Sequence, residues 1–120
     1  MPLVKQTLSL AAGATSSAVL TGTTYEYVGP NVGVRVAAAT DQAPAASGSN
    51  VVMNFTMNNT ELTKNGAVSQ LTAGDAFGHT GNYVLNDTRT PADSVRNRPI
   101  ITFTNNTASN ALVDFAVFIS

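Results

Sequence analysis

Histidine, the side chain most often used for proton transfer, occurs once in this chain, as His79 within the stretch Gly74–Gly81. A nucleophilic triad would need an activated serine or threonine beside it and a carboxylate such as Asp75 to orient its second ring nitrogen. The sequence holds no Gly-x-Ser-x-Gly elbow. We therefore interpret His79 as an exposed loop residue. Because the chain has no cysteine, we also expect no histidine-based metal site.

Paired carboxylates are the next chemistry to consider. The seven candidates are Glu26, Glu61, Asp41, Asp75, Asp87, Asp93 and Asp114. Glycoside hydrolysis needs two carboxyl groups about 5–10 Å apart across a cleft. Aromatic side chains that could build such a cleft are few, with three Tyr, five Phe and no Trp. A hydrolase is therefore the least favoured function, and we predict no catalytic residues, no cofactor and no enzymatic activity.

Oxygen-rich residues gather between positions 75 and 93 and could in principle hold calcium: Asp75, Asn82, Asn86, Asp87 and Asp93. Their spacing does not match an EF-hand loop. Turns also favour Asn and Asp, because these residues tolerate the left-handed backbone conformation. We interpret the cluster as turn-forming and predict no metal ligands.

Half of the six basic residues, Arg89, Arg96 and Arg98, fall within ten positions. A nucleic-acid groove would interleave such a cluster with stacking aromatics, and none occur in this segment. Asp87 and Asp93 lie in the same segment and weaken its positive field. We interpret the arginines as forming local ion pairs or a subunit contact, and nucleic acid is a disfavoured partner.

Four asparagines, at 54, 58, 86 and 105, begin Asn-x-Thr sequons. We give these sequons no weight, since the start Met1–Lys5 shows no secretory signal and Asn and Thr are abundant enough to pair by chance. No apolar run approaches the ~20 residues of a membrane helix, so no membrane partner is expected.

Charge is unusually scarce, at 11% of residues against a typical ~25%. The surface must then be covered by small polar residues, and the chain holds 16 Thr, 12 Asn and 17 Ala with a net charge of −1. Such a surface gives little repulsion between copies. It suits either contact with neighbours in an assembly or a weakly charged β-protein.

The elements that must position these residues are strands, because period-2 alternation recurs and helical periodicity does not. Expected strands cover 4–10, 18–28 with a break at 21–22, 32–36, 51–57, 82–86, 100–104 and 112–119. Asn65-Gly66 predicts a hairpin turn between arms at 61–64 and 67–71. Segments 37–50 and 72–82 are expected to be loops. Thr90-Pro91 predicts one helical turn at 91–96.

This pattern predicts a single all-β domain, residues 1–120, folded as a two-sheet β-sandwich. A jelly roll is the first choice of topology and an immunoglobulin-like arrangement the second. The predicted core consists of Leu8, Val34, Phe55, Phe103, Phe115 and Val117. Phe118 stands opposite this stripe and belongs either to a second layer or to an interface.

The Met-Pro start, the small-polar composition and the hairpin from Pro99 to Ile119 resemble small structural proteins of bacteriophage virions, of the capsid decoration, minor capsid or spike type. The resemblance implies self-association into a homo-oligomer, contacts with other capsid proteins, and residence in the virion after synthesis in the host cytoplasm. It transfers no site residues. The alternative is a module that binds a host glycan or receptor through loops 37–50 and 72–82, using Tyr25, Tyr27, Phe77 or Tyr83.

Overall fold

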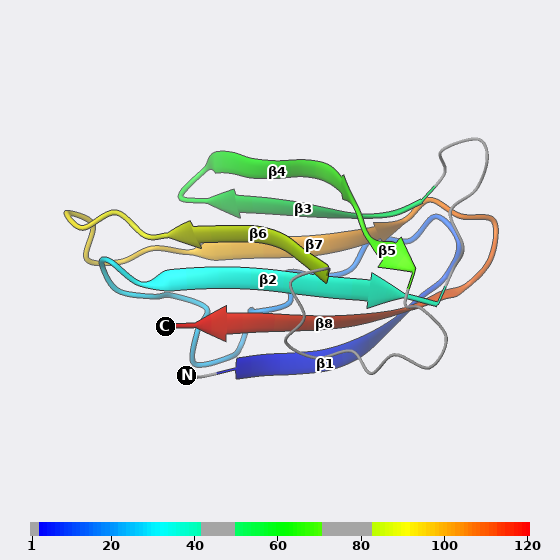
Figure 1. Ribbon diagram of the computed structural model, residues 1–120, viewed down its shortest axis with the longest axis horizontal. Helices are drawn as coiled ribbons and strands as arrows, with labels where there is room; N and C mark the ends of the chain where they lie inside the picture. Colours follow the sequence, from blue (N-terminus) through cyan, green and yellow to red (C-terminus); the bar gives the residue numbers. More distant parts are fainter. Residues whose placement is uncertain (1–2, 42–49, 71–82) are drawn as a thin grey trace.

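The computed structural model describes residues 3–41, 50–70 and 83–120, which form eight strands and, within these ranges, no helix (Figure 1). The all-β prediction is confirmed. The strands are β1 (Leu3–Leu10), β2 (Gly33–Thr40), β3 (Val51–Met57), β4 (Thr60–Ala67), β5 (Ser69–Gln70), β6 (Val84–Arg89), β7 (Pro99–Asn105) and β8 (Ala111–Ile119).

Two sheets face each other. The larger has the order β1-β8-β2, and β2 is flanked on its far side by β6 along most of its length and by β5 at its end. The smaller has the order β4-β3-β7. Residues 13–19 run along the outer side of β7, with backbone hydrogen bonds of 2.7–3.0 Å to Ile101, Phe103 and Asn105. The smaller sheet thus gains a fourth, irregular strand.

The pairing is nested, as in a long hairpin wound into two layers. β3 pairs with β4, β2 with β6, residues 13–19 with β7, and β1 with β8. Crossings between the layers then place β8 beside β2 and β7 beside β3. This order is that of a jelly roll, the first of the two predicted topologies.

The tip of the long hairpin is Asn58-Asn59, between the paired residues Met57 and Thr60. Both asparagines have positive φ, 52° and 67°, as a tight two-residue hairpin turn requires. The prediction of this turn at Asn65-Gly66 is wrong. That dipeptide lies inside β4, where the register with β3 shifts and forms a bulge.

The bulge has its own structural reasons. Asn65 adopts φ 51°, and its backbone N–H donates to Asn54 Oδ1 at 3.0 Å. A Cβ at Gly66 would lie 2.7 Å from the Thr63 methyl carbon, so any larger residue would force a shift there. Both residues therefore meet the backbone demands of a bulge, which are similar to those of a turn.

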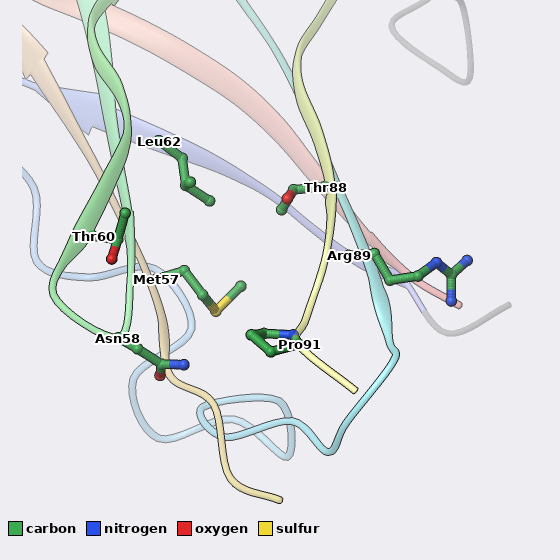
Figure 2. Close-up of a pocket in the computed structure, with 7 residues that line it drawn as sticks. All are labelled: Met57, Asn58, Thr60, Leu62, Thr88, Arg89 and Pro91. Carbon is green, nitrogen blue, oxygen red and sulfur yellow. The ribbon is translucent and has the colours of Figure 1, made fainter. Parts of the chain in front are cut away.

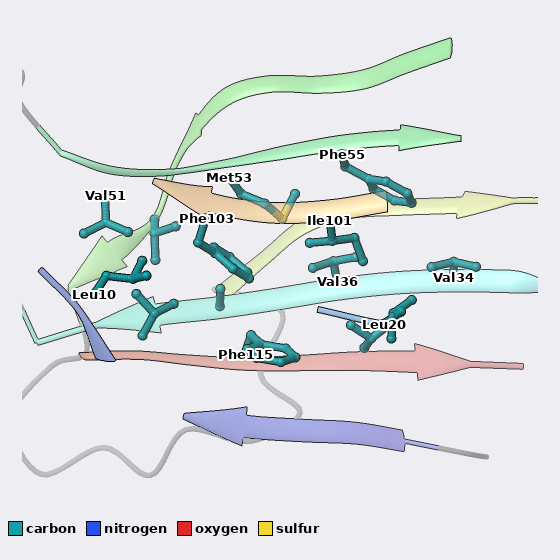
Figure 3. Packing of buried hydrophobic residues seen from close by; sticks show 14 of the residues in the cluster. Leu10, Leu20, Val34, Val36, Val51, Met53, Phe55, Ile101, Phe103 and Phe115 are labelled. Atoms are coloured by element: carbon teal, nitrogen blue, oxygen red, sulfur yellow. The ribbon is translucent and has the colours of Figure 1, made fainter. Parts of the chain in front are cut away.

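The core lies between the sheets and is built from alternate residues of their central strands (Figure 3). Phe103 of β7 and Phe115 of β8 meet across the layers with ring centroids 5.6 Å apart. Of the six predicted core residues, five are fully buried and Leu8 is half-buried against the same cluster. Leu20, from a turn rather than a strand, fills one end of the core and is 1% exposed.

The centre of the larger sheet is buried on its outer face as well. Phe118 is 4% exposed there and clusters with Tyr83, Val84 and small residues, namely Ala37, Ala39 and Ala116. Of the two alternatives for Phe118, a second layer is the one observed.

Three local predictions are wrong. Residues 18–28 form successive turns, because Thr21, Thr23 and Glu26 each donate a backbone hydrogen bond to the carbonyl three residues earlier. β2 continues to Thr40, so the expected loop 37–50 begins four residues late, and 42–49 lie outside the described residues. Residues 91–96 form a non-helical turn instead of the predicted helical turn. Thr90 does not cap a helix, because its hydroxyl bonds to the neighbouring loop at Gly29 and Val32.

Most strand edges of the smaller sheet are covered within the same chain. β3 is a central strand, and residues 13–19 of the same chain cover β7. β4 approaches β6 of the other sheet, where Asn86 Nδ2 donates to Thr63 Oγ1 at 2.7 Å. In the described part of the chain, β1 and β4 are eight-residue strands that pair on one side only, and of the two β4 has the side-chain bond to the other sheet.

Candidate functional site

One end of the sandwich gathers three segments distant in sequence, residues 20–32, 57–60 and 89–98, which we call the loop end (left side of Figure 1). Asn97, which is 0% exposed, holds them together. Its side-chain amide donates to the carbonyls of Gly29 at 3.1 Å and Ser94 at 3.0 Å, with a longer contact of 3.4 Å to Val28. Its Oδ1 accepts from Asn58 Nδ2 at 2.6 Å.

Asn58 completes this connection from the hairpin tip, because its own Oδ1 accepts the Arg98 N–H at 3.0 Å. Thr90, which is also buried, holds the loop that contains Gly29 and Val32. Its hydroxyl accepts from the Val32 N–H at 2.8 Å and donates to the Gly29 carbonyl at 2.7 Å. The loop end is therefore cross-linked by side chains that compensate for the lack of regular strand pairing.

A pocket of about 250 Å³ opens at this end, between the hairpin tip and the end of β6 (Figure 2). Met57, Leu62, Thr88 and Pro91 face its interior. Arg89 borders it, but its side chain points away and donates to the Asn31 carbonyl at 2.7 Å. The pocket is thus lined mainly by apolar groups, with Asn58, Thr60 and Thr88 as its uncharged polar residues. No charged group is directed into it, and it is suited to an apolar side chain rather than to chemistry.

The clustered arginines separate into two roles. Arg89 supports the loop at Asn31, whereas Arg96 and Arg98 lie beside Tyr27, an aromatic residue that is about seventy positions away in sequence. The predicted local ion pairs of these arginines are not observed among the described residues, where an ion pair joins Arg35 and Asp87 at 3.6 Å instead. Tyr27 was a candidate aromatic for ligand binding, but its contact with these arginines joins distant segments and has no signal in the local sequence.

The described carboxylates are mostly committed to structural bonds. Glu26 accepts the Gly22 N–H at 2.8 Å, Asp41 accepts the Leu112 N–H at 2.9 Å, Asp87 pairs with Arg35, and Asp114 accepts from the Thr7 hydroxyl. Asp41 and Asp114 lie near each other where the end of β2 meets the start of β8, but each accepts a structural hydrogen bond. Glu26 and Asp87 lie elsewhere in the fold.

The oxygen-rich residues considered above for calcium are only partly described, since Asp75 and Asn82, like His79, lie outside the described residues. Asn86 bonds to the smaller sheet and Asp87 pairs with Arg35 on the outer face of the larger one, so these neighbours point in opposite directions. Within the described ranges no group of three or more His, Asp or Glu side chains could hold a metal ion.

The sequon asparagines all have structural roles. Asn54 supports the β4 bulge, Asn58 the loop end, and Asn86 the contact between the sheets. Asn105 is fully buried and donates to the carbonyls of Leu10 and Ser109.

The loops proposed for ligand binding, 37–50 and 72–82, lie largely outside the described residues. Of their candidate aromatics, Phe77 is not described and Tyr83 is buried in the outer cluster. Tyr25 and Tyr27 both belong to the loop end, where Tyr27 is 39% exposed. Among the described candidate aromatics, the exposed one is therefore at the loop end.

Comparison of the chain with models of known families, with curated proteins and with solved structures finds no match. Among the described residues, no helix is long and apolar enough to cross a membrane. Assignment of a function depends on the geometry above.

Proposed function

We propose that this protein is a structural subunit of a bacteriophage virion that self-associates through the outer edge of β1. The observation that carries the proposal is this edge: eight residues, paired with β8 on one side and, among the described residues, with no strand on the other. An open strand edge presents N–H and C=O groups that pair readily with another chain.

The side chains of β1 favour such pairing. Natural edge strands are commonly protected by charges, prolines or bulges. β1 has one charged residue, Lys5, and its pairing with β8 runs through all eight residues without a bulge. Val4 and Leu8 face the core but are only half-buried, so a second strand at this edge would remove them further from water.

The composition agrees with an assembled subunit. Thirteen charged residues among 120, with a net charge of −1, give copies little electrostatic reason to stay apart. Jelly rolls recur in viral capsid domains, although they also occur in lectins and other proteins, so the fold alone assigns no function.

The assembly is tested by sedimentation velocity and light scattering at tens of micromolar. We expect a defined oligomer for the natural chain and dissociation for Gln6→Lys, which places an inward-pointing charge on the edge between Val4 and Leu8. Asn106→Lys, with the same charge in an exposed turn, is the matched control and should stay assembled. A monomeric natural chain, or equal behaviour of both variants, would contradict the proposal.

The virion assignment is tested separately, by mass spectrometry and symmetry-averaged electron microscopy of purified particles. We expect this chain in many symmetric copies, in contact with other capsid proteins. Particles that lack the chain would refute the virion role while leaving the oligomer intact.

A further inference from the structure

Two arginine side chains share one exposed aromatic ring at the loop end. The guanidinium carbon of Arg96 lies 3.8 Å from the centroid of the Tyr27 ring, and that of Arg98 lies 5.8 Å from it. Both distances fall within the range of cation–π attraction. Tyr27 thus holds two positive charges near each other on the surface.

The backbone determines this convergence. Val28 and Asn97 form an isolated antiparallel bridge, with backbone hydrogen bonds of 2.8 Å in both directions, and both side chains are buried. Since successive side chains of an extended segment alternate, Arg96 and Arg98 project to the opposite, exposed side together with Tyr27. The hydrogen bonds of buried Asn97 fix the register, so the pair of guanidinium groups is preorganised.

Among the residues that the structure describes, none neutralises either guanidinium group. In the described part of the chain no carboxylate lies within ion-pair distance of Arg96 or Arg98, and no side-chain hydrogen bond occupies their donors. Two like charges on one ring repel each other, and an oxyanion between them would relieve that repulsion. Guanidinium donors match carboxylate, sulfate and phosphate groups in a bidentate geometry.

A shallow pocket of about 260 Å³ adjoins this pair, and Tyr27 is shared between the two. Its walls are aromatic and aliphatic, from Tyr25, Tyr27, Val32 and Ile119, with Thr24 at the rim. This volume lies just below the roughly 300–1,000 Å³ of sites for drug-sized ligands, so it suits one ring rather than a larger ligand.

We propose that the loop end binds an acidic saccharide, with one sugar ring against Tyr25 and Tyr27 and its carboxylate, sulfate or phosphate group between Arg96 and Arg98. This inference goes beyond the assembly role and uses a different surface. An apolar wall beside a two-arginine anion site matches a ligand that has one ring and one acidic group.

Nucleic acid fits the same residues less well. Tight binding to nucleic acid requires several phosphates to be neutralised along a basic tract. Here two arginines lack an acceptor, Arg89 is engaged with Asn31, and the chain as a whole carries a net charge of −1.

Binding is measured on an array of acidic glycans and then by calorimetry with a matched set: lactose, sialyllactose and sulfated lactose. We expect binding of the acidic sugars, weakening as salt rises, and at least tenfold weaker binding of lactose. Arg96→Gln/Arg98→Gln should weaken binding of the acidic sugars at least tenfold. Tyr27→Leu should weaken binding of the sugars more than binding of inorganic sulfate.

The control is Arg35→Gln, which removes one charge on the outer face of the larger sheet and should leave sugar binding unchanged. Circular dichroism and urea unfolding establish that each variant folds. The proposal is overturned if no acidic glycan binds, or if the double variant binds as well as the natural chain. It also fails if inorganic sulfate binds as tightly as the sulfated sugar, or if polyglutamate or single-stranded DNA is preferred to every saccharide.

Discussion

Asn97 gives the sharpest test of how this fold is held together, because one buried amide connects three segments of the loop end. Replacing Asn97 with alanine removes two well-formed donor bonds, to Gly29 and Ser94, and one acceptor bond from Asn58. A neutral hydrogen bond contributes about 1 kcal/mol net, and a buried polar group left unpaired costs ~1–3 kcal/mol. Entry of water into the loop end would recover part of the lost free energy by forming hydrogen bonds with the unpaired groups. We expect Asn97→Ala to lower the free energy of unfolding by ~2–4 kcal/mol.

Urea unfolding followed by circular dichroism measures this loss, provided that the transition is two-state. Asn106→Ala is the matched control, since Asn106 is exposed in a turn, and it should change stability by less than about 0.5 kcal/mol. A double-mutant cycle with Asn58→Ala should give a coupling of roughly 0.5–3 kcal/mol, because the two amides bond directly. A loss below about 1 kcal/mol for Asn97→Ala would refute this account of the loop end.

Three further predictions use the same unfolding measurement. Phe115→Ala should lower the free energy of unfolding by ~3–5 kcal/mol, because its ring is fully buried. Leu112→Ala should lower it by under ~1 kcal/mol, because that side chain is 49% exposed. Equal losses would mean that the two faces of β8 are misassigned. Gly66→Ala should lower the free energy of unfolding by ~1–3 kcal/mol, because the new methyl group clashes with the Thr63 methyl. The loss should be smaller in a Thr63→Ser background, and an equal loss in both backgrounds would exclude the clash. Asn59→Ala should cost ~1–2 kcal/mol at φ 67°, whereas Asn59→Gly should be tolerated, and the reverse order would argue against the tight turn.

The strands that alternation predicts well are those with one face in the core. β3, β7 and the first half of β8 follow this pattern, and Phe55, Phe103 and Phe115 were identified from the sequence because each stands in an apolar stripe. β2 was only half predicted. Its second half is a run of alanines buried on both faces, so its sequence does not alternate between apolar and polar residues.

The turns were predicted less well, because their chemistry is ambiguous. Asn-Gly serves a bulge as readily as a hairpin turn, and Asn58-Asn59 adopts the turn without the glycine that marks it most clearly. The Thr-rich segment 18–28 reads as a strand by composition. Threonine hydroxyls can instead satisfy the backbone locally, as Thr23 Oγ1 does by donating to the Leu20 carbonyl at 2.8 Å.

The candidate site could not be predicted from spacing along the chain. The three clustered arginines were visible in the sequence, but their division into a structural Arg89 and an exposed Arg96–Arg98 pair depends on which loop faces each side chain. The bridge between Val28 and Asn97 is a contact between residues sixty-nine positions apart. No local pattern encodes a contact of that kind.

The two proposed surfaces are geometrically compatible. The edge of β1 runs along the length of the sandwich, whereas the loop end closes one tip of it (Figure 1). A two-fold pair that joins β1 edges in antiparallel fashion would use each β1 edge once and leave no β1 edge for further growth. Both loop ends would stay exposed at opposite tips of such a pair. Each copy could then hold a weakly bound saccharide, and many copies on one particle would bind a glycan-covered surface much more tightly than a single subunit. Gln6→Lys should therefore reduce the retention of assembled protein on an acidic-glycan surface while leaving the affinity of each subunit for a single soluble sugar unchanged.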